Sequence, residues 1–207
     1  DISVITFFRK RQRMKTLIEV KHVKKIYRMG VEKILALDDI SLKIKKGEIL
    51  CLVGTSGSGK STFLNMVAGL EKPTRGEIYI GGIPIHQLNE EKITLFRQKN
   101  IGFIFQSFHL LPMLTALENV SIPLVFRGVE KKKREQIGKA MLEAVGLFGY
   151  EKRKPSQMSG GQQQRVGIAR ALAGDPKIIF ADEPTGNLDS ATSREVMTLM
   201  TKMVREK

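Results

Sequence analysis

Apolar positions along the chain follow two periods, and the change between them predicts where strands and helices lie. Alternation over residues 17–27 and 36–44 predicts two strands, and Lys45-Lys46-Gly47 predicts the turn that follows them. Residues 77–82 have the pattern of a hairpin strand with its turn. Short apolar runs at 48–53, 101–105 and 177–181 predict further strands, of which the first has the composition of a buried parallel strand.

The period becomes helical in three parts of the chain. Residues 63–70 can coil into a helix after the first buried strand, and a second helix begins at Ser159 and ends at Gly174 and Pro176. Between them, residues from about 107 to 155 carry helical periodicity. One face of the predicted helix there combines Ile137, Ala140, Met141, Ala144 and Val145. We therefore expect an inserted helical subdomain at about 107–160.

The segment between the first buried strand and the first helix fits the phosphate-binding pattern G-x-x-x-x-G-K-[ST]. It reads Gly54-Thr55-Ser56-Gly57-Ser58-Gly59-Lys60-Ser61. Glycines let successive backbone N–H groups turn inward, and the helix dipole adds positive potential, so the segment can enclose polyphosphate. In this interpretation Lys60 reaches the β- and γ-phosphates and Ser61 holds Mg²⁺. The alternative is a glycine-rich turn that binds nothing.

Two carboxylates follow the strand at 177–181, and ligands sit at this end of strands in an open parallel sheet. Asp182 is placed to bind Mg²⁺, directly or through water, and Glu183 to orient and deprotonate an attacking water. Adjacent acidic residues after a strand also occur in helix-capping loops. The phosphate-binding pattern at Gly54 favours the catalytic interpretation.

Two further features suggest nucleotide contacts. The helix that opens with Ser159-Gly160-Gly161-Gln162 is a second potential phosphate site, because its first turn offers free N–H groups. Tyr27 is an aromatic residue in an aliphatic segment. On spacing alone, it is equally an adenine platform and an ordinary sheet residue.

Composition narrows the class of protein. The 207 residues include 35 Lys and Arg against 21 Asp and Glu, a formal charge of +14, which suits nucleic acid, an anionic nucleotide or a membrane surface. The lysine run at 131–133 is expected to be a solvated surface, since a nucleic-acid groove would also contain aromatics. Cys51, the one cysteine, is expected to be buried and excludes an intrachain disulfide.

Taken together, these motifs resemble those of the ATP-binding cassette (ABC) ATPases over 15–207. The resemblance makes residues from Gly54 to Thr62 the Walker A motif, Gln106 the Q-loop glutamine and Ser159 to Gln162 the signature, preceded by Met158 in place of the usual leucine. Asp182 becomes the Walker B aspartate, Glu183 the catalytic glutamate and Asp189 part of the D-loop. Tyr27 matches the aromatic that stacks on adenine. The implied fold class is α/β, a P-loop NTPase (RecA-like) core with an antiparallel β edge and the inserted helical subdomain.

The resemblance also implies a mechanism and partners. Two copies pack head to tail as a homodimer, each ATP with its Mg²⁺ lying between Walker A of one copy and the signature of the other. Gln106 joins Ser61 and Asp182 as a metal contact, and Lys60, Gln106 and Glu183 are the implied catalytic residues. Nucleotide then switches the dimer between open and closed states. The partner is an integral membrane permease, at the cytoplasmic face of the inner membrane, and no nucleic acid is expected.

Finer details resemble the macrolide-exporter and lipoprotein-release subgroup (MacB/LolD-like), whose permease is of the FtsX-like type. They lie in 105–112, 162–166 and 183–189. An FtsE-like cell-division cassette stays open, as does a non-transport ABC ATPase acting on nucleic acid or the ribosome, which the charge would suit. A small-molecule kinase is a third class, but it would leave Ser159-Gly160-Gly161-Gln162 unexplained.

The two ends of the chain carry separate expectations. Residues 1–13 place an apolar patch before a basic run, the reverse of a secretory signal, and predict a disordered or non-native leader ahead of an ATPase domain at 14–207. A membrane-surface tether is the alternative. The family's switch histidine follows the strand after the D-loop helix. His22, His86 and His109 all precede Asp182, so the sequence is expected to be a C-terminally incomplete cassette that hydrolyses ATP weakly.

Overall fold

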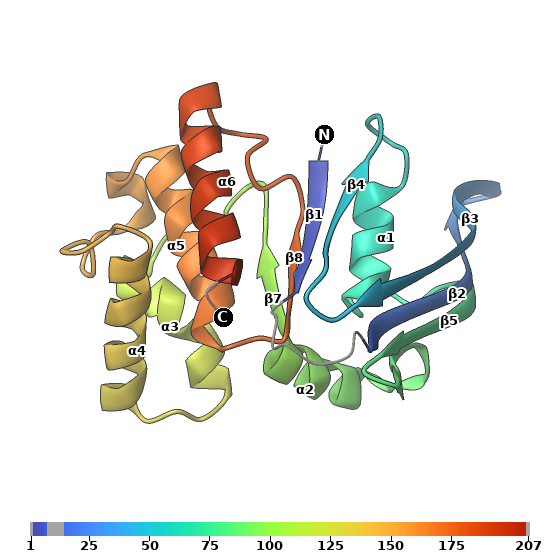
Figure 1. Ribbon diagram of the computed structural model, residues 1–207, viewed down its shortest axis with the longest axis horizontal. Coiled ribbons are helices and arrows are strands. Elements are labelled where there is room, and N and C mark those ends of the chain that lie inside the picture. The colour runs from blue at the N-terminus through green and yellow to red at the C-terminus, as the bar shows by residue number, and fades with distance from the viewer. Residues whose placement is uncertain (1, 8–14, 206–207) are drawn as a thin grey trace.

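The computed structural model describes residues 2–7 and 15–205, and side chains from 15 to 203. Two four-stranded sheets flank helix α1 (Lys60–Val67) (Figure 1). The core sheet has the order β4 (Ile49–Val53), β1 (Ile2–Phe7), β8 (Ile178–Ala181), β7 (Ile101–Ile104). The second sheet is antiparallel and has the order β3 (Glu32–Lys45), β2 (Thr16–Met29), β5 (Arg75–Ile80), β6 (Ile83–Pro84).

The remaining helices cover the core sheet on the side away from α1 and close its lower end. They are α2 (Glu90–Asn100), α3 (Ala116–Phe126), α4 (Lys131–Ala144), α5 (Gly160–Ala173) and α6 (Ser190–Arg205), with short 3₁₀ turns at Ile85–Gln87 and Pro155–Gln157. Helix α5 packs against α3, α4, α6 and β7. The predicted fold class is confirmed, whereas α2 was not expected because residues 90–100 carry only one buried apolar residue, Ile93.

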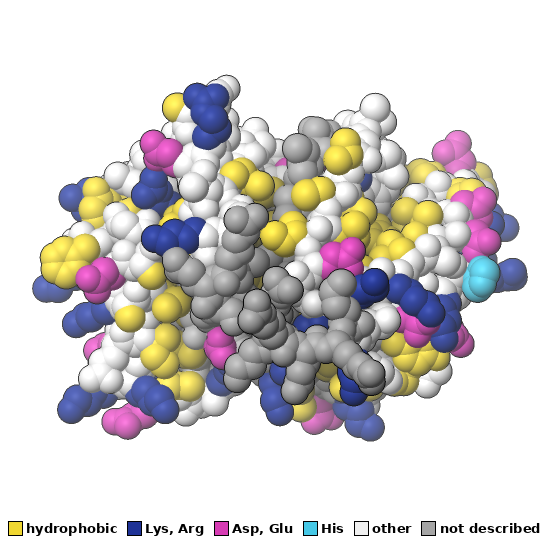
Figure 2. Space-filling model, in the orientation of Figure 1, with side chains coloured by type: hydrophobic (Ala, Val, Ile, Leu, Met, Phe, Trp, Pro, Cys, Tyr) yellow, Lys and Arg dark blue, Asp and Glu magenta, His cyan; other side chains and the backbone are white. Residues whose placement is uncertain are grey.

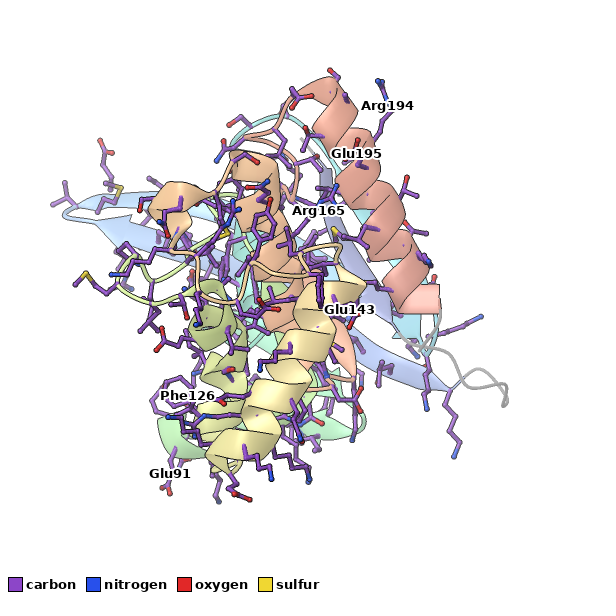
Figure 3. The ribbon with its side chains drawn as sticks, turned by 90° about the vertical axis from the view of Figure 1, so that its left-hand side faces the viewer. Glu91, Phe126, Glu143, Arg165, Arg194 and Glu195 are labelled. Carbon is purple, nitrogen blue, oxygen red and sulfur yellow. The ribbon has the colours of Figure 1, made fainter. Side chains whose placement is uncertain are left out.

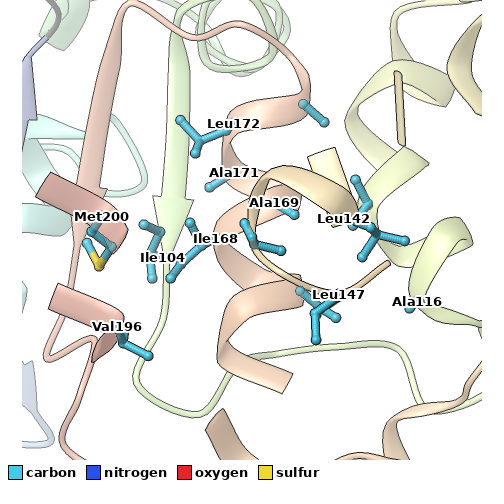
Figure 4. Packing of buried hydrophobic residues seen from close by; sticks show 14 of the residues in the cluster. Ile104, Ala116, Leu142, Leu147, Ile168, Ala169, Ala171, Leu172, Val196 and Met200 are labelled. Atoms are coloured by element: carbon cyan, nitrogen blue, oxygen red, sulfur yellow. The ribbon is translucent and has the colours of Figure 1, made fainter. Parts of the chain in front are cut away.

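Strand β8 separates two hydrophobic cores. Ile178 and Phe180 pack with α1 and the second sheet, while Ile179 and Ala181 face α5 and α6. This alternation follows from the opposite directions of successive side chains in a strand. In the second core, Ile104 of β7 lies beside Ile168 of α5, with Val196 and Met200 of α6 next to them (Figure 4). Strand β8 is therefore held from both sides.

The N-terminal segment differs from the expected disordered leader. Residues 2–7 form β1, which pairs antiparallel with both β4 and β8, whereas β7 pairs parallel with β8. The backbones of β4 and β8 need hydrogen-bond partners along these edges, and the run Val4-Ile5-Thr6-Phe7 has strong strand propensity. Residues 1 and 8–13 lie outside the described part of the chain. A non-native origin of this segment stays a prediction.

Cys51 is exposed, so the expectation of a buried thiol is wrong. In β4 the side chains of Leu50 and Leu52 pack toward α1, and those of Ile49, Cys51 and Val53 face the other way. Val53 is 78% exposed. The space-filling view shows hydrophobic side chains over β4 on this face (Figure 2). A continuous apolar run thus does not make both faces of this strand buried.

Candidate nucleotide-binding and catalytic site

The phosphate-binding segment connects β4 to α1 and leaves the start of α1 open. Gly59, the N-cap residue, has φ 89°, which favours glycine, and a Cβ there would lie 2.6 Å from the carbonyl oxygen of Ala36. No side chain caps α1, and no acidic residue lies in its first turn. The first N–H groups of the helix and its dipole are therefore directed to the loop, as an anion requires.

Lys60 is the buried cation of this loop, with 9% of its surface exposed. Its Nζ donates to the carbonyl oxygens of Gly54 and Thr55, each at 2.9 Å. A side chain at Gly54 would collide with Ser58, whose Oγ lies 2.6 Å from the ideal Cβ position. The ammonium group is thus held within the loop. It is already desolvated there before an oxyanion binds.

A direct contact joins two motifs that lie 121 residues apart. Ser61 Oγ donates to Asp182 Oδ1 at 3.0 Å. Asp182 follows β8, and its backbone N–H donates to Ile104 at the end of β7 at 3.0 Å. A hydroxyl and a carboxylate oxygen side by side are hard oxygen donors of the kind that Mg²⁺ prefers. The donor set therefore fits the predicted metal contacts of Ser61 and Asp182.

Glu183 begins a tight turn directly after Asp182. Its φ is 43°, in the left-handed region that non-glycine residues rarely adopt, and its carbonyl oxygen accepts from Gly186 N at 3.0 Å. The next carbonyl, that of Pro184, accepts from Nε2 of Gln164, a fully buried residue of α5. Helix α5 thus holds the turn that carries the candidate catalytic carboxylate.

Gln106 follows β7 and is bound to the same turn region. Asn187 Nδ2 donates to the carbonyl oxygen of Gln106 at 3.2 Å, and Gln106 Nε2 lies 3.5 Å from Asn187 Oδ1. A side chain at Gly186 would meet Gln106 Nε2 at 2.7 Å. The amide of Gln106 therefore lies against the Glu183 turn, although the structure shows no contact of Gln106 with Ser61.

Arg170 of α5 holds the segment that follows Gln106. Its guanidinium donates to the carbonyl oxygens of Phe108 at 2.7 Å and His109 at 2.5 Å. Both residues have positive φ values, 60° and 46°, so the segment needs such restraint. Burial lowers the pKa of Arg170. The arginine fixes the path of the chain out of the Q-loop position.

Tyr27 is anchored by its hydroxyl, which donates to Glu71 Oε2 at 2.7 Å. Lys25 lies 3.1 Å from the same carboxylate, and its Nζ is 4.9 Å from the centre of the tyrosine ring. Burial would raise the pKa of Glu71, but hydrogen bonds from Tyr27, Lys25 and Asn65 lower it below its ordinary value. Burial, with the bond to Glu71, raises the pKa of Tyr27. The ring is thus fixed near the C-terminal end of β2.

Ser159 and Gln162 form a capping box at the start of α5. Ser159 N donates to Gln162 Oε1 at 3.0 Å, and Gln162 N donates to Ser159 Oγ at 3.3 Å. A Cβ on Gly161 would lie 2.5 Å from Thr192 Cγ2 of α6. Close packing beside α6 therefore favours glycine at 161, whereas a Cβ on Gly160 would make only ordinary contacts, the nearest at 3.5 Å from Leu188 Cδ2.

Asp189 caps α6 and does not point to a nucleotide contact within this chain. Its Oδ1 accepts from the N–H groups of Ala191 and Thr192, each at 3.0 Å, and Oδ2 accepts from Thr192 Oγ1 at 2.5 Å. The bond from the Thr192 side chain is the main reason why the pKa of Asp189 is lowered. The predicted ligand contact of Asp189 stays a prediction.

Comparison with known proteins decides the family. A family model described as ABC transporter matches residues 37–186. The chain belongs to the ABC transporter family. Among curated relatives, an uncharacterized ABC transporter ATP-binding protein, MJ0796, of Methanocaldococcus jannaschii is 50% identical over 194 residues, which cover 92% of this chain and 83% of the relative. The lipoprotein-releasing system ATP-binding protein LolD of Aquifex aeolicus is 45% identical, with the same coverage of both chains.

Solved structures give the same assignment. The dimeric structure of the MJ0796 cassette in a post-hydrolysis state, bound to ADP and Pi, superposes with a TM-score of 0.83 at 46% identity and covers 92% of this chain and 84% of that one. A second dimeric structure of MJ0796, described as a bacterial ABC transporter cassette, also has a TM-score of 0.83. The chain is therefore an ATP-binding, ATP-hydrolysing ABC domain, similar to the MacB/LolD-like subgroup.

Within this ABC domain, the predicted site residues fall into two groups. Lys60, Ser61, Asp182, Glu183 and Gln106 surround the connections of β4, β8 and β7. Residues 159–162 lie at the start of α5, and Figure 1 shows α1 and α5 on opposite sides of the core sheet. Sequence reasoning missed Arg170, and it placed Gln164 and Asn187 only within the segments 162–166 and 183–189, without their supporting contacts. Only their position beside recognised motifs could have indicated them.

Proposed function

We propose that this ABC ATPase energises a membrane exporter of the MacB/LolD-like type, at the cytoplasmic face of the cell membrane, by ATP-driven pairing of two copies. The similarity to LolD and to the dimeric MJ0796 cassettes supports this proposal. In the described part of the chain, no helix combines the length and the apolar character needed to cross a membrane. The path for the substrate would be provided by a permease.

The proposed nucleotide site uses groups that the fold already holds in place. The N–H groups from Gly54 to Thr62 and the Lys60 ammonium bind the phosphates, while Tyr27 supports the adenine. Ser61, Asp182 and Gln106 hold Mg²⁺, which neutralises phosphate charge when bound. Glu183 accepts the proton of the attacking water, and its carboxylate is oriented by the turn that Gln164 holds.

The placement of α1 and α5 on opposite sides of the core sheet carries the pairing proposal (Figure 1). Their side chains belong to different hydrophobic cores, separated by β8. One chain therefore cannot bring Ser159-Gly160-Gly161-Gln162 to a phosphate bound at Lys60. A second copy, packed head to tail, can present this segment there, so that each nucleotide is enclosed by both chains.

Two variants test nucleotide use and pairing together. Glu183→Gln should keep nucleotide affinity, slow hydrolysis by roughly 10²-fold or more as expected for a lost general base, and accumulate a dimer with Mg-ATP on gel filtration. Lys60→Ala should lose ATP binding or turnover, because the phosphates lose their point charge. Glu143→Gln, an exposed carboxylate of α4 (Figure 3), is the matched control and should behave as the parent. A Glu183→Gln chain that stays monomeric with Mg-ATP and hydrolyses normally would refute the proposal.

A groove between α3 and the core is the proposed docking site for the permease. It has a volume of about 240 Å³ and is lined by Leu70 and Phe105 on one side and by Ile122, Pro123 and Phe126 on the other. Phe126 is 67% exposed and points outward at the end of α3 (Figure 3). Arg97 lines the groove, so the occupant is expected to be a permease segment with an apolar face and acidic side chains.

Phe126→Glu tests this docking site. Co-expressed with the integral membrane protein encoded beside its gene, the parent chain should sediment with membranes, and the variant should remain in the supernatant. Phe148→Glu is the matched control, because Phe148 is 78% exposed outside the groove. Equal membrane binding of both variants, or a neighbouring gene that encodes no membrane protein, would contradict the permease proposal.

A further inference from the structure

The guanidinium group of Arg127 binds the C-termini of two helices, and Arg127 itself ends a third. Arg127 is the C-cap residue of α3, Gly174 is the C-cap of α5, and Gln98 and Lys99 lie in the last turn of α2. Its Nε donates to the carbonyl oxygen of Gln98 at 2.8 Å, and Nη2 donates to the carbonyl oxygens of both Gln98 and Lys99, the latter at 3.1 Å. Nη1 donates to the carbonyl oxygen of Gly174.

This arrangement suits arginine and no other side chain. Each helix C-terminus leaves unpaired carbonyl oxygens and a negative partial charge. One planar guanidinium can donate in several fixed directions at once, whereas a lysine ammonium acts as a point charge. A Cβ on Gly174 would lie 3.2 Å from the guanidinium carbon, so the glycine leaves space for the contact.

The position of Arg127 connects two functional surfaces. Phe126, the preceding residue, and Gln98, whose carbonyl oxygen it binds, both line the groove proposed for the permease. At the other end of the contact, Gly174 terminates α5, the helix that begins with Ser159-Gly160-Gly161-Gln162. An α-helix is a stiff element, so a restraint at one end sets the direction of the other.

We propose that Arg127 is a positioning residue that holds α5 against the end of α2 and so sets the orientation of the signature segment for ATP-driven pairing. Permease binding in the groove then acts on α5 through this guanidinium. This inference rests on the proposed pairing of two copies. It adds a residue that touches neither nucleotide nor the second copy's phosphate-binding loop.

The test separates nucleotide binding from pairing. In the Glu183→Gln background, Arg127→Lys and Arg127→Ala should each weaken Mg-ATP-dependent dimerisation about tenfold, the order expected for losing charge-assisted hydrogen bonds. In the otherwise unchanged chain, kcat should fall by a similar factor. Affinity of the monomer for a fluorescent ATP analogue should stay at the parent value, because α1 and Tyr27 lie outside the contact. Arg134→Lys is the matched control, since the Arg134 guanidinium donates within its own segment, to Val129 O at 3.3 Å.

The outcomes are distinguishable. Parent-like dimerisation and kcat in Arg127→Lys would show that charge alone suffices and would overturn the positioning role. Loss of analogue binding together with a large fall in melting temperature would show that Arg127 serves general stability, which also overturns it. Failure of the Glu183→Gln background itself to dimerise would instead refute the proposed pairing.

Discussion

Tyr27, the proposed adenine platform, is a side chain whose position is fixed within this chain. Its hydroxyl is bound to Glu71, which Lys25 also contacts, so the ring is held without help from nucleotide. Tyr27→Ala should weaken ATP binding by roughly 1–3 kcal/mol, by analogy with base stacking on aromatics. Tyr27→Phe should change affinity little, because Lys25 and Asn65 still satisfy Glu71. Isothermal titration with ATP measures both, and equal losses would point to the hydroxyl instead of stacking.

A substitution at Gln164 can distinguish an effect on stability from an effect on activity. Its Nε2 donates to Pro184 O, whereas its buried Oε1 has no hydrogen-bond partner among the described residues. Gln164→Met keeps the volume and removes this unsatisfied acceptor, but it also leaves the carbonyl oxygen of the buried Pro184 without this donor. Because the two effects oppose each other, the melting temperature should change little. The turn at Glu183 loses the hydrogen bond that restrains it, so kcat should fall. A fall of about tenfold is expected, because that factor corresponds to the free energy of one hydrogen bond. ATP affinity should be unchanged.

Gln136→Met, at an exposed position of α4, is the control for the chemistry of this change. If Gln164→Met retains the parent kcat, the restraint from α5 does not position Glu183. A variant that loses ATP affinity along with kcat would indicate damage beyond the turn.

At this scale, the sequence predicted the residues that belong to contiguous motifs and missed those that support them. Lys60 and Ser61 belong to one phosphate-binding segment, and their proposed roles follow from its local pattern. Gln164 and Arg170 act on segments that lie 20 to 62 residues away. Only the packing of α5 against β7 and β8 brings these partners together, and no local pattern encodes it.

Among the elements, β1 allows the most direct test, because it lies between β4 and β8 in the core sheet. Deleting residues 1–7 removes paired backbone groups along both neighbours and exposes two sheet edges. The shortened chain should melt several degrees lower and associate more readily, as measured by calorimetry and light scattering. A disordered leader would instead leave the melting temperature unchanged.

The sequence predicted an element correctly where its apolar residues followed a single pattern. The strands at 48–53, 101–105 and 177–181 were found because their apolar runs are flanked by turn or polar residues. Helix α2 was missed because one face carries only Ile93 as a buried residue. The face of α4 was predicted in part: Val145 is buried and Ile137 and Met141 pack against the core, as expected. Ala140 and Ala144 are exposed, and Gly138 and Leu142 are buried in their place. Small residues gave too little hydrophobic contrast to define that face.

At the scale of the whole molecule, the helical subdomain and the core are joined mainly through α5. Its polar side chains contact the Glu183 turn, the segment after Gln106 and, through Arg165 and Glu195 at 2.7 Å, helix α6 (Figure 3). Its C-cap is bound by Arg127. Displacement of α5 would therefore change contacts at both ends of the core sheet. The sequence predicted the subdomain but could not place α5 opposite α1.

The central claim is that each nucleotide is enclosed by Lys60 of one copy and the signature segment of another. Thiol cross-linking tests it most directly. In a Cys51→Ser, Glu183→Gln chain, Ser56→Cys and Ser159→Cys place one thiol in each half-site, both at exposed positions. With a short bismaleimide and Mg-ATP, we predict a covalent dimer on denaturing gels, absent without ATP and in either single-cysteine variant. A product that is only cross-linked within one chain, or a dimer that forms equally without ATP, would contradict the account.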